Sequence, residues 1–134
     1  MPLLKDILLP VQVVRTIGEA QVEVTGLCLD SRQAAPGFGF LAVKGVHADG
    51  HQFIAAAINA GVRVVFCEQV PASIQDDVTY VQLNNVGRAA GLIASAFYGD
   101  PSASMKVVGV TGTNGKTTVA TLLYQLFQEL GYKT

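Results

Sequence analysis

The chain has 134 residues, half of them hydrophobic, which suffices for one compact domain with its own core. Its formal net charge is −1, so no basic surface indicates nucleic-acid binding. The N-terminal stretch is interrupted by Asp6 and Pro10, unlike a signal peptide, and no apolar run approaches membrane-spanning length. We therefore expect neither a nucleic acid nor a membrane as a partner.

The cysteines and histidines do not form a recognisable metal motif. Cys28 and Cys67 stand alone, without C-x-x-C spacing, and are typical of reduced cysteines in a cytosolic protein. His47 and His51 lack a third partner of metal-binding type, so they make no zinc site. We expect both histidines to be solvated, one in a loop and one at the start of a helix.

The elements expected along the chain alternate between strands and helices. Apolar alternation or continuous apolar runs predict the strands, and a 3.6-residue apolar period predicts the longer helices. In chain order we expect a helix over 3–9, strands over 11–17, 22–29 and 38–43, a helix over 51–60, strands over 62–67 and 79–83, and a helix capped by Asn84 or Asn85. This order predicts an α/β fold.

Two of the predicted helices have a clear apolar face. On the helix over 51–60 the face comprises Phe53, Ile54, Ala57 and Ile58, and Gly61 is a suitable C-terminal stop. On the next helix it comprises Val86, Ala89, Ala90, Ile93, Ala96 and Phe97.

A cluster of Gly, Pro and Ser over 99–104 predicts a boundary. We assign residues 1–99 to a small α/β domain, 100–105 to a linker and 106–134 to the start of a second domain. The last helix has an apolar stripe formed by Val119, Leu122, Leu123, Leu126, Phe127 and Leu130. One β–α unit cannot bury this stripe alone, so we expect a truncated second domain that self-associates or frays, and a chain that is inactive by itself.

The stretch 107–118, VVGVTGTNGKTT, predicts a buried strand, a tight glycine turn and a helix that begins at Lys116. Glycines let several N–H groups point at one spot, and a helix N-terminus adds unpaired N–H groups. Lys116 can steady outer phosphates and the Thr117 hydroxyl can ligate Mg²⁺. The common P-loop pattern is not fully met, because Val110 stands where that pattern requires glycine. The alternative is an ordinary strand–turn–helix with a lysine in its first turn.

Three motifs resemble the Mur ligase family, the ATP-dependent amide-forming enzymes of peptidoglycan assembly. They are LDSR at 29–32, GVHADGHQF at 45–53, and FYGDPS at 97–102 leading into the glycine turn. Within the family they are most similar to the MurE type, which adds the third residue to UDP-MurNAc-L-Ala-D-Glu. The MurF type shares the first two motifs in similar form, but it usually has serine in place of Thr113 and lacks the FYGDPS lead-in.

The resemblance implies a small N-terminal α/β domain of MurE type, followed by the first β–P-loop–α unit of a truncated central ATPase domain. The residues matching the family's UDP-sugar contacts are Leu29, Ser31, Val46, His47 and Ala48. Those matching its ATP site are Gly112, Thr113, Asn114, Gly115, Lys116, Thr117 and Thr118, with Lys116 catalytic and Thr117 a ligand of Mg²⁺. The implied cofactors are ATP and Mg²⁺, the partners are UDP-MurNAc-dipeptide and an amino acid, and the location is cytoplasmic.

Several alternatives stay open from the sequence. Ser31 is equally suited to capping a turn after its strand. Asp30 and Arg32 are also suited to a surface ion pair worth well under about 1 kcal/mol. The chain as a whole also fits a MurF-type ligase or a uridine-nucleotide-binding module without catalysis. The choice between meso-diaminopimelate and lysine as the added residue depends on a site outside this sequence.

Overall fold

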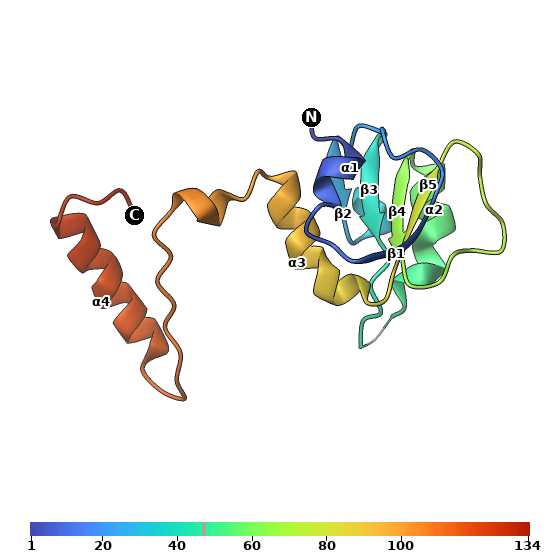
Figure 1. The fold of residues 1–134 in the computed structure, drawn as a ribbon. Helices are drawn as coiled ribbons and strands as arrows, with labels where there is room; N and C mark the ends of the chain where they lie inside the picture. The colour runs from blue at the N-terminus through green and yellow to red at the C-terminus, as the bar shows by residue number, and fades with distance from the viewer. Residues whose placement is uncertain (47) are drawn as a thin grey trace. The chain divides into compact units, whose positions relative to one another are not determined.

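The structure is a computed structural model that describes residues 1–46 and 48–134. His47, one of the predicted substrate residues, lies outside the described residues. The chain divides into two compact units, Met1–Pro101 and Ser102–Thr134. The first unit contains the whole sheet, and the second contains the long helix α4, Lys116–Glu129 (Figure 1).

The first unit is built on a five-stranded sheet with the order β1-β5-β4-β3-β2. Its strands are β1 Val13–Ile17, β2 Gly26–Cys28, β3 Phe38–Leu41, β4 Val64–Cys67 and β5 Thr79–Leu83. The strands from β2 to β5 run parallel to one another, and β1 pairs antiparallel with β5 at one edge. The carboxyl ends of the parallel strands therefore meet at one edge of the sheet, where α/β proteins bind their ligands.

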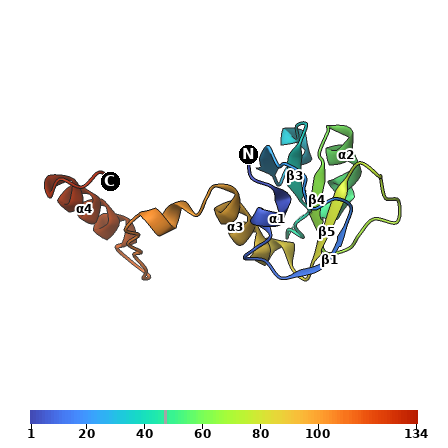
Figure 2. The same ribbon diagram turned by 45° about the horizontal axis from the view of Figure 1, so that its top comes forward.

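Helices cover both faces of this sheet, which makes a three-layer arrangement (Figures 1 and 2). Helices α1, Leu4–Ile7, and α3, Val86–Phe97, contact each other on one face, and α2, Ile54–Asn59, lies on the other. A short 3₁₀ turn, Ser31–Gln33, comes after β2 in the chain, and another, Gly50–Phe53, comes after β3.

The two faces of the sheet carry separate apolar cores, because side chains alternate along a strand. In β4, Val64 and Phe66 pack in the core under α1 and α3, whereas Val65 and Cys67 pack in the core under α2. All four side chains are buried. Parallel strands that are covered on both faces have continuous apolar sequences, so the strand predicted over 62–67 is confirmed over Val64–Cys67.

Most of the other predicted elements form with shorter bounds. The strand predicted over 22–29 is reduced to Gly26–Cys28, because its first half bonds to the N-terminal segment instead of the sheet. The Leu4 N–H donates to the Val22 carbonyl at 2.9 Å, and the Val24 N–H donates to the Pro2 carbonyl at 3.1 Å. The cap of α3 is Asn85, whose side-chain oxygen accepts the Arg88 N–H at 2.7 Å.

The predicted position of Phe53 on the buried face of its helix is wrong, since 43% of this residue is exposed. The helix predicted over 51–60 begins as the 3₁₀ turn Gly50–Phe53, and only Ile54–Asn59 is α-helical. A 3₁₀ turn has three residues per turn instead of 3.6. Phe53 therefore falls off the face on which Ile54 and Ala57 are buried.

In the second unit, helix α4 forms but the predicted strand over 106–110 does not. Val107 and Val108 are exposed by 70% and 57%. A strand is defined by hydrogen bonds to a neighbouring strand, and within Ser102–Thr134 the only regular elements are α4 and a short 3₁₀ turn. The apolar stripe of α4 is uncovered at Val119, Leu122, Leu126 and Leu130, and half-buried at Leu123 and Phe127.

Among the residues that the structure describes, no helix has the length and apolar character needed to span a membrane. Cys28 and Cys67 are both free and buried, and of the core and near-surface positions that the sequence allowed, both occupy the core. Burial raises the pKa of the Cys67 thiol to about 11, so this thiol stays protonated near neutral pH and behaves as a small apolar side chain.

Two neighbouring residues of α3 test the core under this helix. Ile93 is fully buried, whereas Leu92 is 49% exposed on the same helix. We expect Ile93→Ala to lower the free energy of unfolding by roughly 2–5 kcal/mol, because it leaves a cavity. Leu92→Ala, the matched control, should change it by less than about 1 kcal/mol. Urea denaturation of both variants measures the difference, and equal losses would contradict the proposed packing.

Candidate functional site

An open depression of about 510 Å³ brings together two of the sequence motifs. Its lining residues are Leu29, Asp30, Ser31, Arg32, Ala48 and Phe53. The first four directly follow β2, and Ala48 belongs to the segment after β3. The depression therefore lies at the carboxyl ends of two neighbouring parallel strands, and its volume is in the range of small-molecule sites.

Another open depression, of about 450 Å³, lies between the segment before β1 and the start of α3. Its lining residues are Pro10, Val11, Gln12, Leu83, Asn84, Asn85, Arg88, Ala89 and Leu92. It contains none of the predicted site residues, so the depression at Ser31 is the better candidate site.

One wall of the candidate site is the ion pair between Asp30 and Arg32. The Asp30 carboxylate caps the 3₁₀ turn Ser31–Gln33 by accepting the Arg32 backbone N–H at 2.9 Å. It also accepts the Arg32 Nε–H at 2.9 and 3.0 Å and the Nη2–H at 2.6 Å. The turn is therefore capped by Asp30 and not by Ser31, and the ion pair that the sequence left open is present. Ser31 keeps its place in the lining of the depression.

The second wall is the turn that Gly45 and Ala48 close, with an isolated antiparallel bridge between Lys44 and Asp49 at its base. The Gly45 N–H donates to the Ala48 carbonyl at 2.9 Å, and the Gly50 N–H donates to the Val43 carbonyl at 2.9 Å. A Cβ at Gly50 would lie 2.8 Å from the backbone N and O of Val43, so this position requires glycine. Val46 is 96% exposed at the tip and does not line the depression.

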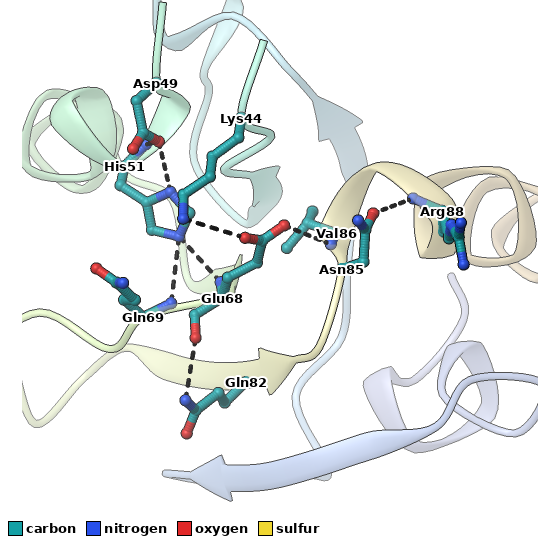
Figure 3. A network of polar contacts seen from close by, with 9 residues as sticks. All are labelled: Lys44, Asp49, His51, Glu68, Gln69, Gln82, Asn85, Val86 and Arg88. Atoms are coloured by element: carbon teal, nitrogen blue, oxygen red, sulfur yellow. Dashed lines mark hydrogen bonds and ion pairs between the residues drawn. The ribbon is translucent and has the colours of Figure 1, made fainter.

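A polar network ties this turn to the sheet (Figure 3). The Asp49 carboxylate accepts the His51 backbone N–H at 3.0 Å and faces the ring Nδ1 at 2.6 Å. On the other side of the ring, Nε2 accepts the backbone N–H groups of Glu68 at 2.9 Å and Gln69 at 3.3 Å. The two hydrogen bonds from His51 lower the pKa of Asp49, so its carboxylate stays ionised.

Glu68 extends the network to the start of α3 and to Lys44, which lies at the base of the turn. Its carboxylate accepts the Val86 backbone N–H at 3.3 Å and lies 3.4 Å from the Lys44 ammonium. Its backbone carbonyl accepts the Gln82 side-chain N–H at 3.0 Å. Figure 3 shows Glu68 between the His51 ring, Lys44 and the start of α3.

The expectation that His51 is solvated is wrong, because only 13% of its side chain is exposed. The sequence signal that could have revealed its role is Asp49, two residues earlier, since an Asp side chain commonly caps the turn that follows it. The partners of its Nε2 come from residues 68 and 69. No local pattern could identify partners so far away along the chain.

The glycine turn of the second unit has the geometry of an anion-binding loop. Gly115, with φ of +75°, lies in the left-handed region and precedes α4 without a side-chain cap. The first backbone bond of the helix joins the Val119 N–H to the Gly115 carbonyl at 3.0 Å. The N–H groups of residues 116–118 therefore have no intrahelical acceptor and are available to an anion.

The side chains at the start of α4 complete this donor set. The Lys116 ammonium donates to the Gly112 carbonyl at 2.5 Å, across the turn, and its side chain is exposed. Thr117 occupies the first turn of the helix. An ammonium, a hydroxyl and free N–H groups fit a phosphate chain that carries Mg²⁺. Elsewhere in the described part of the chain, no cluster of His, Cys, Asp and Glu is suited to a metal ion.

Parallel strands covered by helices on both faces, with a depression at their carboxyl edge, define an α/β ligand-binding protein. A family model described as "Mur ligase family, catalytic domain" matches residues 23–98. The chain belongs to the Mur ligase family.

Several relatives with similar sequences carry the name UDP-N-acetylmuramoyl-L-alanyl-D-glutamate–2,6-diaminopimelate ligase. The chain is 47% identical over 131 residues to the protein of this name from Phocaeicola vulgatus, covering 98% of the chain and 27% of the relative. It is 48% identical over 132 residues to that from Cytophaga hutchinsonii, with the same coverage. The chain thus spans about a quarter of the length of the curated relatives that it matches.

Solved structures of MurF ligases are also similar. MurF from Acinetobacter baumannii has a TM-score of 0.76 at 26% identity, covering 97% of this chain and 29% of MurF. The MurF ligase from Thermotoga maritima in complex with ADP has a TM-score of 0.62 at 31% identity, covering 77% of this chain and 23% of that structure. These similarities confirm the predicted α/β fold of the Mur ligases.

The Asp30–Arg32 ion pair predicts how the stability of the fold and the titration of Asp30 depend on pH. Hydrogen bonds from the Arg32 side chain and backbone lower the pKa of Asp30 to about 2. The ionised carboxylate therefore stabilises the fold above its unfolded-state pKa of about 4, and this contribution is lost as the pH falls from about 4 toward 2. In Arg32→Gln, carboxyl ¹³C NMR should show Asp30 titrating at higher pH than in the unmodified chain. An identical midpoint in both proteins would show that Arg32 does not hold this carboxylate.

Proposed function

We propose that this chain is part of a MurE-type ATP-dependent amide ligase of peptidoglycan synthesis. In this proposal, residues 1–99 bind the UDP part of UDP-MurNAc-L-Ala-D-Glu, residues 100–105 are a linker, and residues 106–134 open the ATP-binding domain. The relatives whose name contains this substrate support the proposal, since they are 47–48% identical over nearly the whole chain.

The observation that carries the proposal is the meeting of Leu29, Ser31 and Ala48 around one depression. These residues come from LDSR and GVHADG, the two motifs that resemble the family's UDP-sugar contacts. The folded chain thus supplies a hydroxyl and apolar surface together at a ligand-binding edge. Val46 would contribute from the exposed tip of the same turn, and His47 is included in the proposal from the motif alone. Phe53 adds an aromatic surface that the motif comparison did not include.

The proposed reaction joins an amine to the D-Glu carboxylate of the UDP-linked dipeptide. The γ-phosphoryl group of ATP is transferred to this carboxylate, which releases ADP and gives an acyl phosphate. The amine of a diamino acid, meso-diaminopimelate or lysine, then attacks the acyl carbon, and inorganic phosphate leaves with formation of the amide bond.

The loop over 112–118 would position ATP for this transfer. Lys116 would neutralise charge on the β- and γ-phosphates, the Thr117 hydroxyl would hold Mg²⁺, and the loop N–H groups would bind the remaining oxygens. The other residues of the loop, Gly112, Thr113, Asn114, Gly115 and Thr118, shape it and contribute backbone N–H groups. The related MurF ligase from Thermotoga maritima is in complex with ADP, which supports an adenine nucleotide as a ligand of the proposed ligase.

A MurF-type ligase is the second candidate, and the similar solved structures described above favour it, since they are MurF enzymes. Their identities of 26–31% are lower than the 47–48% of the relatives named for the diaminopimelate-adding reaction. Assaying the complete ligase with UDP-MurNAc-dipeptide and with UDP-MurNAc-tripeptide separates the two, since each type extends a different peptide.

Binding of UDP tests the assignment of the first unit. Titration of UDP into ¹⁵N-labelled chain should shift amide signals of residues 29–32 and 46–48, because these segments meet at the depression. Ser31→Ala should weaken binding about tenfold through loss of one hydrogen bond, whereas the exposed Ser73→Ala serves as the control and should bind normally. Shifts confined to 112–118 would mean that the chain recognises only phosphate, and would refute this assignment.

Lys116→Ala tests the phosphate loop. Loss of the only side-chain ammonium in the loop should weaken Mg·ATP binding at least about tenfold and abolish turnover of the complete ligase. Lys133→Ala, a matched change outside the loop, should retain both. Circular dichroism checks that α4 keeps its helicity. Unchanged turnover in a folded Lys116→Ala enzyme would remove Lys116 from the catalytic site.

A further inference from the structure

The turn over 45–48 needs support from outside itself. Within it, the Gly45 N–H bonds to the Ala48 carbonyl, and an isolated bridge pairs Lys44 with Asp49. These contacts close the turn, and the bond from the Gly50 N–H to the Val43 carbonyl joins its returning arm to the segment that follows β3. Side chains at the base of the turn add a second connection, to β4 and α3.

The His51 ring provides such a connection. Two backbone N–H groups point at its Nε2, and because N–H groups can only donate, Nε2 carries no hydrogen. The remaining hydrogen is on Nδ1, which donates to the Asp49 carboxylate. The ring is therefore held as the neutral Nδ1–H tautomer, with a partner at each nitrogen.

The partners of the ring connect the turn to the central, buried strand of the unit. Glu68 and Gln69 directly follow β4, which is the central strand of the sheet. Glu68 is in turn bonded to the first N–H of α3 and to Lys44. His51 thus links the base of the turn, through Asp49, to the carboxyl end of β4 and the start of α3 (Figure 3).

We propose that His51 is a positioning residue, which holds the turn over 45–48, and with it Ala48, against the depression lined by Leu29 and Ser31. This inference rests on the proposed function, in which that depression takes a uridine nucleotide. His51 is not among the residues that line the depression, and both of its ring nitrogens already have partners. It acts through the turn, so its loss should weaken UDP binding more than an equal loss of stability elsewhere in the fold would.

Three substitutions separate the two sides of the ring. His51→Leu removes both polar contacts. His51→Asn keeps a donor at the place of Nδ1 for Asp49, and His51→Gln keeps an acceptor at the place of Nε2 for the Glu68 N–H. If the contact with β4 positions the turn, His51→Gln should restore more of the UDP affinity than His51→Asn.

Thr79→Val is the matched control. Thr79 is 2% exposed and begins β5, at the opposite edge of the sheet from the site. Its hydroxyl donates to the Glu19 carbonyl at 2.9 Å and accepts the Glu19 N–H at 3.0 Å. The substitution therefore removes two buried hydrogen bonds without touching the turn, and reports the effect of lost stability alone.

The experiment measures UDP affinity, melting temperature and the amide signals of residues 45–48 in the free protein. We expect His51→Leu to move these signals and weaken UDP binding at least tenfold, and Thr79→Val to lower the melting temperature comparably with binding unchanged. Unmoved turn signals, or equal weakening by Thr79→Val, would overturn the positioning role. Failure of the unmodified chain to respond to UDP would instead refute the proposed function, and the turn signals of the free variants would still decide whether His51 places the turn.

Discussion

The burial of strand β4 on both faces is the constraint on which the first unit depends. All four of its residues are buried, two in each core. A strand in this position must have neighbours on both sides and helices above and below it, because its backbone and its side chains are cut off from water. These requirements align the carboxyl ends of β2, β3, β4 and β5 along one edge, and the loops that leave this edge carry the candidate site.

The charges at this edge are arranged as local pairs. Asp30 is neutralised by Arg32, Asp49 bonds to His51, and Glu68 lies near Lys44. Every described buried side-chain nitrogen or oxygen has a hydrogen-bond partner. The pairs therefore act mainly on backbone geometry: Asp30 caps one turn, Asp49 caps another, and Glu68 accepts the first N–H of α3. What remains for a ligand is the surface between them, with Ser31, Ala48 and Phe53.

The second unit differs from the first in that its loop geometry is formed locally, whereas most of its apolar residues are not buried. Its phosphate loop is a local structure, in which Gly115 supplies a left-handed backbone conformation and Lys116 reaches back to the Gly112 carbonyl. Such a loop can form next to a single helix. Its apolar residues remain exposed, since a stripe on α4 and the valines before the loop can be buried only by further elements. Local geometry and burial are therefore separate requirements, and only the first is met within Ser102–Thr134.

The sequence by itself determined the features that depend on neighbouring residues. Local patterns predict the apolar run over 62–67, the period of the helix over 86–97, its capping by Asn84 or Asn85, and the glycine turn before Lys116. The structure selects Asn85 as the cap. The tertiary structure decided the features that depend on distant partners. His51 is buried because residues 68 and 69 offer it N–H groups, and residues 106–110 form no strand because no neighbouring strand is present in their unit. Phe53 lines the depression because a 3₁₀ turn shifts it off the helical face. Hydrogen-bond partners and neighbours across a sheet come from positions far apart along the chain, so their effect becomes visible only in the folded molecule.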